Sequence, residues 1–408
     1  MPTLMDYLAE QGQEPMETRP FCALDSLALT QIVYMPMEGF LEPGQTATVA
    51  ELAAWLAHAY PEGLVDPFQR KRFDCTLLCA RCARFAQLTL SDYLNHVDAQ
   101  QETQFCACVF ALPDGSRYVS IRGTDLTLAG WKEDLNMSFM PVPAQREATE
   151  YLDRAAGAFS GPLRVGGHSK GGHLALFAAA HAAPETQARL ADVYSFDGQG
   201  VDEATLLSEG YARVAALVQS YIPQSSVVGM LLCYHPVYRV VKSTALGLFQ
   251  HDVLTWQVAG CDFEILAGLD LGTRMADEAL RQWIDRLSLP DRRLLTDTTF
   301  RLISTLDPET IDPLVQDLPA SSFKLMAAFR HLEPETRAAM RRMLGDLFSS
   351  GANEAVRTLL PGTFRRFVET PATALPLAER VRARSADLLH SLRPGSAEDA
   401  QPDEPQTN

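Results

Sequence analysis

Basic residues, long apolar runs and a secretory signal are all scarce or missing in this sequence. Its 408 residues include 35 Lys or Arg against 51 Asp or Glu, a formal net charge of −16. Such an acidic chain repels phosphate backbones and anionic lipid surfaces, so nucleic-acid binding is not expected. No uncharged apolar stretch reaches about 18 residues, so no integral membrane segment is predicted. Residues 1–7 lack the basic start of a secretory signal, which favours a cytoplasmic location.

Cysteines are also few, with eight in the chain, and they do not form the dense pattern of a disulfide framework. Three of them, Cys75, Cys79 and Cys82, invite interpretation as a metal site. However, the surrounding segment 73–85 carries apolar residues at helical spacing, and buried thiols pack as small hydrophobic groups. We therefore interpret these three cysteines as core residues and expect no metal ion.

Hydrophobic residues make up 47% of the chain, enough for one large or two ordinary domains. Residues 1 to about 100 are predicted to be mostly helical, with Asp25 and Ser26 capping a helix. Beyond them, short β-prone segments alternate with helical ones, and the first two flank a turn typical of a hairpin. The predicted strands are 105–112, 117–122, 163–167, 193–196 and 217–222. This alternation predicts an α/β fold with a mostly parallel sheet flanked by helices.

The β signals end at about residue 262, where the sequence becomes rich in Leu and Arg. Proline residues that begin helices recur there, so we expect a helical C-terminal appendage. The last residues are rich in Pro, Gly and acidic side chains, which is typical of a disordered tail. The predicted organisation is an α/β domain over 1–262, including the N-terminal helices, a helical region over 263–392 and a tail over 393–408.

The strongest chemical signal is a G-x-S-x-G motif from Gly167 to Gly171, between a predicted strand and a predicted alanine-rich helix. Such a turn projects the hydroxyl of its central residue, Ser169, above the sheet, and the glycines leave room for the sharp backbone. The helix N-terminus favours developing negative charge at the same place. The alternative, a nucleotide-binding glycine-rich turn, lacks the G-x-G-x-x-G spacing and its acidic partner. Ser169 is therefore the candidate nucleophile.

The residues 167–172 resemble the G-H-S-L-G-G elbow of class 3, fungal-type lipases. Upstream, the segment 121–125 is similar to the end of a strand and the R-G-[ST] turn of that family. Trp131 and Asp134 follow it at the spacing of the family's W-x-x-D helix. The resemblance covers about residues 105 to 256.

A closer resemblance is to a mostly bacterial, lipase-like family labelled Mbeg-like, which shares the D-S-L-x-L segment at residues 25–29 and whose name implies no substrate. Both resemblances imply an α/β-hydrolase fold. They also imply an oxyanion hole formed by the backbone N–H of Thr124, with its hydroxyl, and by the backbone N–H of Lys170. Acyl transfer independently needs two donors aimed at the tetrahedral oxygen. At Lys170 the sequence departs from the lipases, which usually have Leu.

The general base is expected after Ser169, because α/β-hydrolases order their triad as Ser, acid and His. Two of the later histidines belong to the helix after the elbow and two to the helical appendage, which leaves His235 and His251. We favour His251, because it lies in the loop after the last strand, in a Q-H-D segment similar to the Mbeg-like pattern. A turn role for His235 and an ordinary loop role for His251 stay open. The histidines after Ser169 are His173, His181, His235, His251, His331 and His390.

The acid is the least defined member of the triad. Where class 3 lipases have it, this sequence has Ser225 and Ser226 and no carboxylate. Asp197 ends the preceding strand, and side chains at the carboxyl ends of neighbouring parallel strands converge above a sheet. Asp252 adjoins His251, but consecutive side chains generally point apart. We predict that Asp197 accepts from His251 Nδ1, and an ordinary turn role for Asp197 stays open.

Together these residues predict a serine hydrolase of the lipase or esterase type, acting through an acyl-enzyme on Ser169. We expect a small-molecule or lipid ester as the substrate and neither a metal nor an organic cofactor. The N-terminal helices and residues 227–241 are expected to cover the site and supply an apolar acyl pocket. The alternative is a catalytically weak or inactive scaffold whose C-terminal helices bind another protein. The missing carboxylate near Ser225 favours that alternative.

Overall fold

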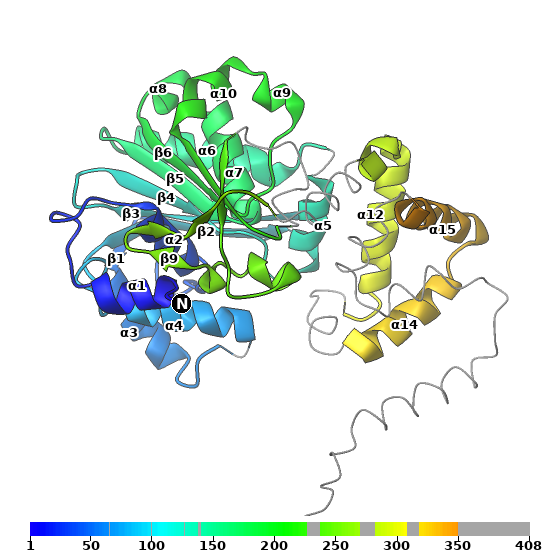
Figure 1. Ribbon diagram of the computed structural model, residues 1–408, viewed down its shortest axis with the longest axis horizontal. Helices are drawn as coiled ribbons and strands as arrows, with labels where there is room; N and C mark the ends of the chain where they lie inside the picture. The colour runs from blue at the N-terminus through cyan, green and yellow to red at the C-terminus, as the bar shows by residue number, and fades with distance from the viewer. Residues whose placement is uncertain are drawn as a thin grey trace, which may run out of the picture.

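A nine-stranded sheet forms the centre of the computed structural model (Figure 1). The structure describes residues 1–64, 66–98, 100–125, 127–137, 140–226, 237–269, 282–307 and 318–349. In sheet order the strands are β1 (Thr46–Thr48), β2 (Thr89–Asp98), β3 (Thr103–Ala111), β4 (Arg117–Ile121), β5 (Leu163–His168), β6 (Leu190–Phe196), β7 (Val218–Pro223), β8 (Tyr238–Val241) and β11 (Ile265–Leu266). The strands from β4 to β8 run parallel, and the outer strands pair antiparallel. This is the predicted α/β-hydrolase-type sheet.

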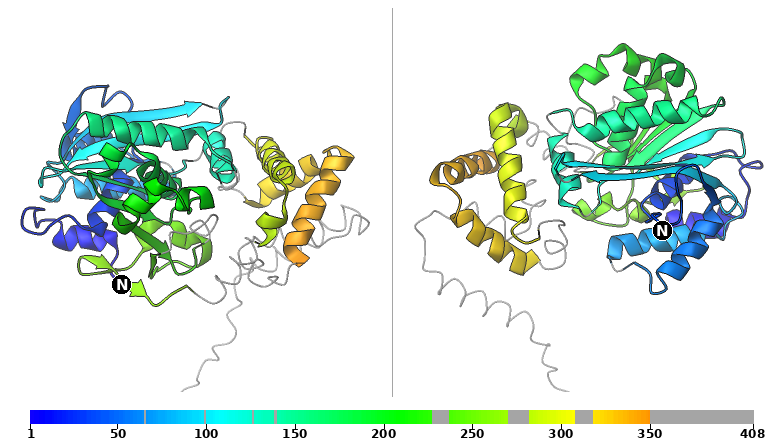
Figure 2. Two further views of the ribbon diagram at one scale, coloured as in Figure 1. Left: turned by 90° about the horizontal axis from the view of Figure 1, so that it is seen from above. Right: turned by 180° about the vertical axis from the view of Figure 1, so that it is seen from behind.

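Helices cover both faces of the sheet, as the parallel strands require, because their apolar side chains point to both sides (Figure 2). One layer contains α1 (Leu4–Gln11), α2 (Ala23–Ile32), α3 (Val49–Ala59) and α4 (Pro67–Cys79). The other contains α6 (Pro143–Gly157), α7 (Lys170–His181) and the short helices α8 (Pro184–Gln187), α9 (Glu203–Leu206) and α10 (Glu209–Val214). Helix α5 (Leu128–Asn136) lies at the end of β3. The parallel strands all end on the same side of the sheet, so the residues that follow neighbouring strands lie close together there.

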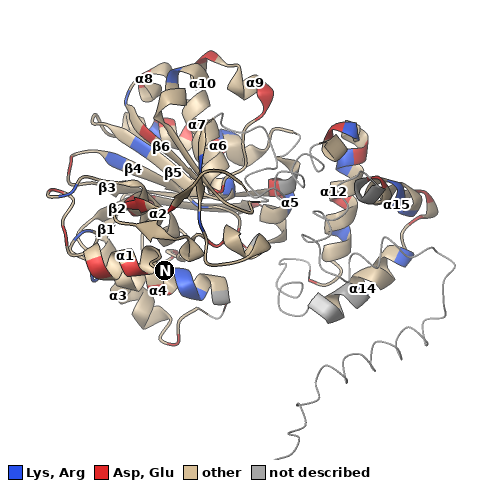
Figure 3. Cartoon of the chain, viewed as in Figure 1, with Lys and Arg blue, Asp and Glu red and all other residues tan. Residues whose placement is uncertain are grey.

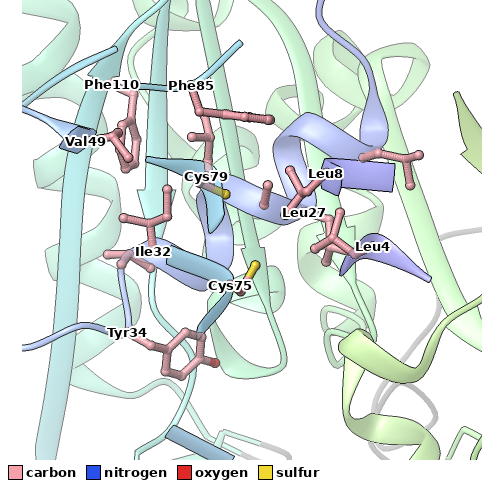
Figure 4. Close-up of a cluster of buried hydrophobic side chains, with 14 of the residues drawn as sticks. Leu4, Leu8, Leu27, Ile32, Tyr34, Val49, Cys75, Cys79, Phe85 and Phe110 are labelled. Carbon is pink, nitrogen blue, oxygen red and sulfur yellow. The ribbon is translucent and has the colours of Figure 1, made fainter. Parts of the chain in front are cut away.

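The N-terminal helices belong to the hydrophobic core. Leu4, Leu27 and Ile32 pack with Phe110 of β3 in one buried cluster (Figure 4). The three closely spaced cysteines lie in the same cluster, as the sequence predicted. Helix α4 ends at Cys79, however, so the third cysteine sits in the turn that follows. Burial raises the pKa of that thiol, Cys82, to about 11, which keeps it protonated and unreactive at neutral pH.

The prediction of a mostly helical N-terminal region missed strands β1 and β2. Strand β2 has a polar sequence and a bulge between Ser91 and Leu94, where Asp92 adopts a φ of 53°. A bulge shifts the two-residue alternation by one position, so no regular β pattern is visible in the sequence. The predicted hairpin, by contrast, is present as β3 and β4.

Helix α2 begins two residues earlier than the cap predicted at Asp25. Asp25 occupies the third helical position and accepts from the Cys22 N–H at 2.9 Å. Its carboxylate is fully buried and pairs with Arg84, while Tyr7 donates to it at 2.9 Å. A buried charge is stable only when paired and hydrogen-bonded in this way. The pair fixes α2 against α1 and the turn after α4.

The sheet extends slightly beyond the domain boundary predicted at residue 262. A small hairpin of β9 (Val258–Ala259) and β10 (Asp262–Phe263) precedes β11, which pairs with β8. Short 3-10 helices stand at Ala215–Leu217, Gly247–His251 and Val253–Thr255.

The part of the chain after β11 is helical where the structure describes it. It contains α12 (Leu289–Ile303), α14 (Leu318–Arg330) and α15 (Pro334–Ser349), with charges of both signs on α12 and α15 (Figure 3). Trp283, Phe329 and Met340 form their own small core. An ion pair of 2.9 Å between Lys132 of α5 and Asp297 of α12 joins this region to the sheet domain. The predicted tail, 393–408, lies outside the described residues, among which no helix is long and apolar enough to cross a membrane.

Candidate active site

Ser169 lies on a sharp turn between strand β5 and helix α7. Its φ of 59° and ψ of −132° are rarely adopted by a residue with a side chain. Such strain persists only where the surrounding structure imposes it, and it clusters at functional sites. The Ser169 N–H donates to Phe196 O at 2.9 Å, which ties the turn to the end of β6. The predicted elbow is therefore present as a strained strand-to-helix turn.

Two glycines allow the backbone to pass close to the elbow. A Cβ atom on Gly171 would clash with the Ile121 carbonyl oxygen, and one on Gly167 would clash with the backbone of Gly171. Helix α7 therefore starts directly against the end of β4. This close approach places Gly123 beside Ser169, and a Cβ added to Gly123 would lie 3.2 Å from the Ser169 Cβ.

We expect Gly171→Ala to destabilise the protein by about 1–3 kcal/mol or more, because the added methyl group has no room beside rigid backbone. The matched control is Gly157→Ala at the end of α6, where an added Cβ meets no atom within 4 Å. That control should be neutral or stabilising by about 0.4–1 kcal/mol. Urea unfolding of both variants tests this, and equal midpoints would contradict the close-packed elbow.

His251 comes from the 3-10 helix after β8 and reaches Ser169. Its Nε2 atom lies 2.9 Å from Ser169 Oγ. The side chain is 31% exposed, so a substrate and water have access to it. Ser169 and His251 are 82 residues apart in the sequence, so only the folding of the sheet domain brings them together.

Asp197 lies on the other side of the imidazole. Its Oδ2 atom is 2.7 Å from His251 Nδ1, and its side chain is 1% exposed. Asp197 directly follows β6 and, like Ser169, has a positive φ, of 46°. The Ser226 hydroxyl donates to the other carboxylate oxygen, Oδ1. The structure thus brings Asp197 to the histidine, and one of the two serines at the expected acid position supports the carboxylate instead of replacing it.

The two predicted oxyanion donors flank Ser169. Lys170 is the first residue of α7, where backbone N–H groups lack helical acceptors, and Thr124 follows Gly123 in the loop beside the elbow. Within the part of the chain that the structure describes, neither N–H has a hydrogen-bond partner. The buried Thr124 hydroxyl lies near the Asp134 carboxylate, whose pKa it lowers, so only the two N–H groups are counted as donors. These donors stay available for an oxygen bound above the elbow.

The Lys170 side chain runs away from the site into the protein. Its ammonium group is fully buried, forms an ion pair with Glu133 and donates to Gln104 O at 2.7 Å. Glu133 also accepts from the backbone N–H groups of Gln104 and Ala144, at 2.9 and 3.0 Å. This network holds the first turn of α7 against β3 and α5. It gives a physical reason for a lysine where class 3 lipases have leucine.

Lys170→Met should therefore lower the free energy of unfolding by about 3–5 kcal/mol, because Glu133 is left buried without its cation. The matched control is Lys242→Met, which breaks a partly exposed pair with Glu264 and should cost at most about 1 kcal/mol. Chemical denaturation of both variants gives the comparison. A Lys170→Met protein as stable as the control would refute the structural role of the pair.

Asp134, in the segment similar to the lipase W-x-x-D helix, is buried next to the loop of Gly123 and Thr124, the predicted oxyanion loop. Gln199 donates to it at 3.0 Å. Burial raises its pKa, an effect opposed by the Lys170 charge and by the Thr124 hydroxyl. Asp134 therefore connects the Thr124 loop to the segment after Asp197.

The other histidines after Ser169 do not reach the site where the structure describes them. His173 is buried, donates from Nδ1 to Gly200 O at 2.7 Å and accepts from Gln145, while burial lowers its pKa to about 4. His181 bonds its own helix, and His331 lies in the turn after α14. His235 and His390 lie outside the described residues, so the choice between His235 and His251 rests on the geometry of His251 alone.

Two residues around the triad have roles for which the sequence carries no local pattern. They are Ser226, which stands where class 3 lipases have the acid, and Glu133. Their partners are remote in sequence, 29 and 37 residues away, so no local pattern indicates the contacts. For Glu133 the available signal was Lys170 itself, since a lysine in an otherwise apolar helix start needs a buried anion.

Comparison with known proteins confirms the resemblance to the Mbeg-like family. The model of this family, described as Mbeg1-like, matches residues 79–301, which is more than half of the chain. No curated protein matches the sequence. A crystal structure of M37 lipase is similar at 14% identity and a TM-score of 0.32, over 50% of this chain and 68% of that chain. The chain, with its α/β sheet and its serine on a strained elbow, belongs to the Mbeg1-like family.

Proposed function

We propose that the protein is a serine hydrolase that cleaves carboxylic esters. The observation that carries the proposal is the continuous line of hydrogen bonds from Ser169 through His251 to Asp197, at 2.9 and 2.7 Å. A hydroxyl, an imidazole and a buried carboxylate in this order are the arrangement that activates a serine for acyl transfer. Asp197 also supplies the carboxylate whose absence near Ser225 favoured a non-catalytic scaffold.

The mechanism follows from the positions of these atoms. His251 Nε2 takes the proton of the Ser169 hydroxyl as Oγ attacks the ester carbonyl carbon. The carbonyl oxygen becomes an oxyanion, for which the N–H groups of Thr124 and Lys170 are the donors. The protonated imidazole then gives its proton to the departing alcohol, leaving an acyl-enzyme on Ser169. Water, deprotonated by the same imidazole, releases the acid and restores the serine.

Asp197 would orient the imidazole and stabilise its charged form during both steps. Its side chain is nearly inaccessible, so its interaction with the imidazolium is weakly screened by water. Two exposed apolar residues of the loop that carries His251, Leu246 and Phe249, support an ester with an apolar acyl chain or alcohol. The His251 loop thus fits a hydrophobic ester better than a charged one.

The test is turnover of p-nitrophenyl esters of increasing chain length by the purified protein. Hydrolysis that rises from acetate to butyrate and octanoate supports the proposal, and p-nitrophenyl phosphate serves as a control that a carboxylic-ester hydrolase leaves intact. A protein that turns over none of the esters above the buffer rate contradicts it.

The acid is tested separately by comparing Asp197→Asn, Ser226→Ala and Ser225→Ala. We expect Asp197→Asn to lower kcat by about 10²- to 10⁴-fold, because an amide holds the wrong imidazole tautomer and supplies no charge. Ser226→Ala removes one hydrogen bond to the carboxylate and should cost about 10-fold or less. Ser225→Ala should have the smallest effect. An Asp197→Asn enzyme as active as Ser225→Ala would reject Asp197 as the acid.

A further inference from the structure

Two buried side chains behind the triad have no role in the mechanism above. Tyr34 follows helix α2 and is 3% exposed, with its ring at the edge of the buried cluster (Figure 4). His168 is the last residue of β5, directly before Ser169, and is 2% exposed. A buried imidazole and a buried phenol each need hydrogen-bond partners. Their partners connect three segments of the site.

The hydrogen bonds of His168 define its tautomer. Its Nε2 atom lies 2.9 Å from the carbonyl oxygen of His251, which accepts only, so Nε2 carries the proton. Burial, together with the nearby Arg72 charge, holds the pKa of His168 well below its ordinary value, so the ring is neutral. The Nδ1 atom is then a bare acceptor, and the Tyr34 hydroxyl lies 3.3 Å from it.

The other end of this chain of bonds is the oxyanion loop. The Gly123 N–H donates to the Tyr34 oxygen at 3.1 Å, so the phenol accepts from Gly123 and donates to His168. The Arg72 guanidinium lies 3.9 Å from the centre of the Tyr34 ring, and a cation over the ring strengthens phenol donation. Every bond therefore has one direction: Gly123 to Tyr34, Tyr34 to His168, and His168 to the His251 backbone.

The loop that carries His251 is held by buried polar groups, among them the Gln250 side chain, whose Oε1 accepts from the Ser225 N–H at 2.9 Å. His251 belongs to a short 3-10 helix, and Leu246 and Phe249 in the same loop are 80% and 70% exposed. Among the described contacts, two consecutive carbonyl groups of this loop are held by buried donors: Gln250 O by the Trp256 indole at 2.8 Å and His251 O by His168. The rings of His168 and His251 also touch, with centroids 4.7 Å apart. Loss of the His168 donor would leave the His251 carbonyl oxygen without its buried partner and loosen the backbone of the base.

We propose that Tyr34 and His168 are positioning residues that fix the backbone of His251 relative to Ser169 and the oxyanion loop. The inference deepens the proposed hydrolase function and rests on it. It assigns a task to the N-terminal layer, since α2 delivers Tyr34 to the site, and to the histidine that precedes the nucleophile. Neither side chain touches the reacting atoms.

The kinetic test compares two substitutions of His168. Gln reproduces the donor that reaches the His251 carbonyl, while Leu fills the buried space without any donor. Positioning predicts that His168→Gln keeps a kcat at least about 10-fold above that of His168→Leu, with KM changed by about twofold or less in both. A role in packing alone predicts the opposite order, because leucine is the better buried residue. Leu equal to or better than Gln overturns the proposal.

Tyr34→Phe removes only the hydroxyl that holds His168 Nδ1. We expect kcat to fall about 10-fold while KM stays within about twofold. The matched control is Tyr151→Phe, which removes a buried hydroxyl bond of 2.7 Å to the Asp92 carbonyl, remote from the site. The control should lose similar stability and keep its kcat. An unchanged kcat in Tyr34→Phe contradicts the proposed chain of bonds.

A measurement without turnover separates this proposal from the hydrolase function. Nitrogen-15 NMR of histidine-labelled protein at neutral pH reports which ring nitrogen carries the proton, and the signal lost in His168→Gln identifies His168. The expected state is neutral with the proton on Nε2. A charged ring or a proton on Nδ1 overturns the positioning proposal even in an active enzyme. If the wild-type protein hydrolyses no ester, the proposed hydrolase function is wrong. The tautomer of His168 then tests the chain of hydrogen bonds by itself.

Discussion

Ser169→Ala is expected to reduce ester hydrolysis by on the order of 10⁴- to 10⁶-fold, close to the background rate. The hydroxyl forms the covalent bond to the acyl group, and no neighbouring nucleophile within the described residues lies against the imidazole. The oxyanion donors and the binding surface stay intact, so a small residual rate above water is expected. Initial rates with the best p-nitrophenyl ester, measured at equal protein concentrations, provide the comparison.

The control for Ser169→Ala is its stability. The Ser169 side chain contributes one hydrogen bond to His251 and little packing, so the urea midpoint should remain close to that of the wild-type protein. An enzyme that folds normally and keeps its activity without this hydroxyl would rule out Ser169 as the nucleophile.

His251→Ala should have an effect of similar size, on the order of 10⁴- to 10⁶-fold in kcat, because Ser169 is a weak nucleophile without an adjacent base. The double variant Ser169→Ala/His251→Ala should lose no more than either single variant. The reason is that the two groups act as one unit, so removing the second after the first costs nothing further. Parallel rate measurements on the three variants test this non-additivity.

Losses that multiply in the double variant would show that Ser169 and His251 act independently, contrary to the 2.9 Å contact. A His251→Ala protein with near wild-type turnover would direct attention to a histidine outside the described residues, such as His235. His181→Ala, on the exposed end of α7, serves as the control substitution and should leave the rate unchanged.

The parts of the fold that depend on local sequence were predictable. The hairpin and the parallel strands are short apolar segments between turn residues, and helix α7 begins where Gly171 and Gly172 allow close packing. Strand β2 escaped prediction because its bulge and polar side chains remove the alternation that identifies a strand. Helix α2 starts earlier than predicted because Asp25 is not the cap. It occupies the third helical position, where its carboxylate pairs with Arg84.

The same distinction between local and long-range features applies to the candidate site. The candidate nucleophile lies in a local motif, so five residues were enough to single out Ser169. The choices of His251 and Asp197 needed the strand order, which the sequence pattern indicated only through the α/β alternation. The supporting residues could not be predicted from the sequence. Ser226, Glu133 and Tyr34 contact residues far away in the sequence, and those contacts exist only in the folded protein.

The central claim, that Ser169 is an activated nucleophile, is tested most directly by a fluorophosphonate probe. Such a probe phosphonylates a serine that an adjacent base deprotonates, and it requires no knowledge of the natural ester. The wild-type protein, treated with the probe and analysed by mass spectrometry, should carry one adduct, on the peptide that contains Ser169. Heat-denatured protein and His251→Ala should carry none. An unmodified wild-type chain, or an adduct on any other residue, would contradict the assignment.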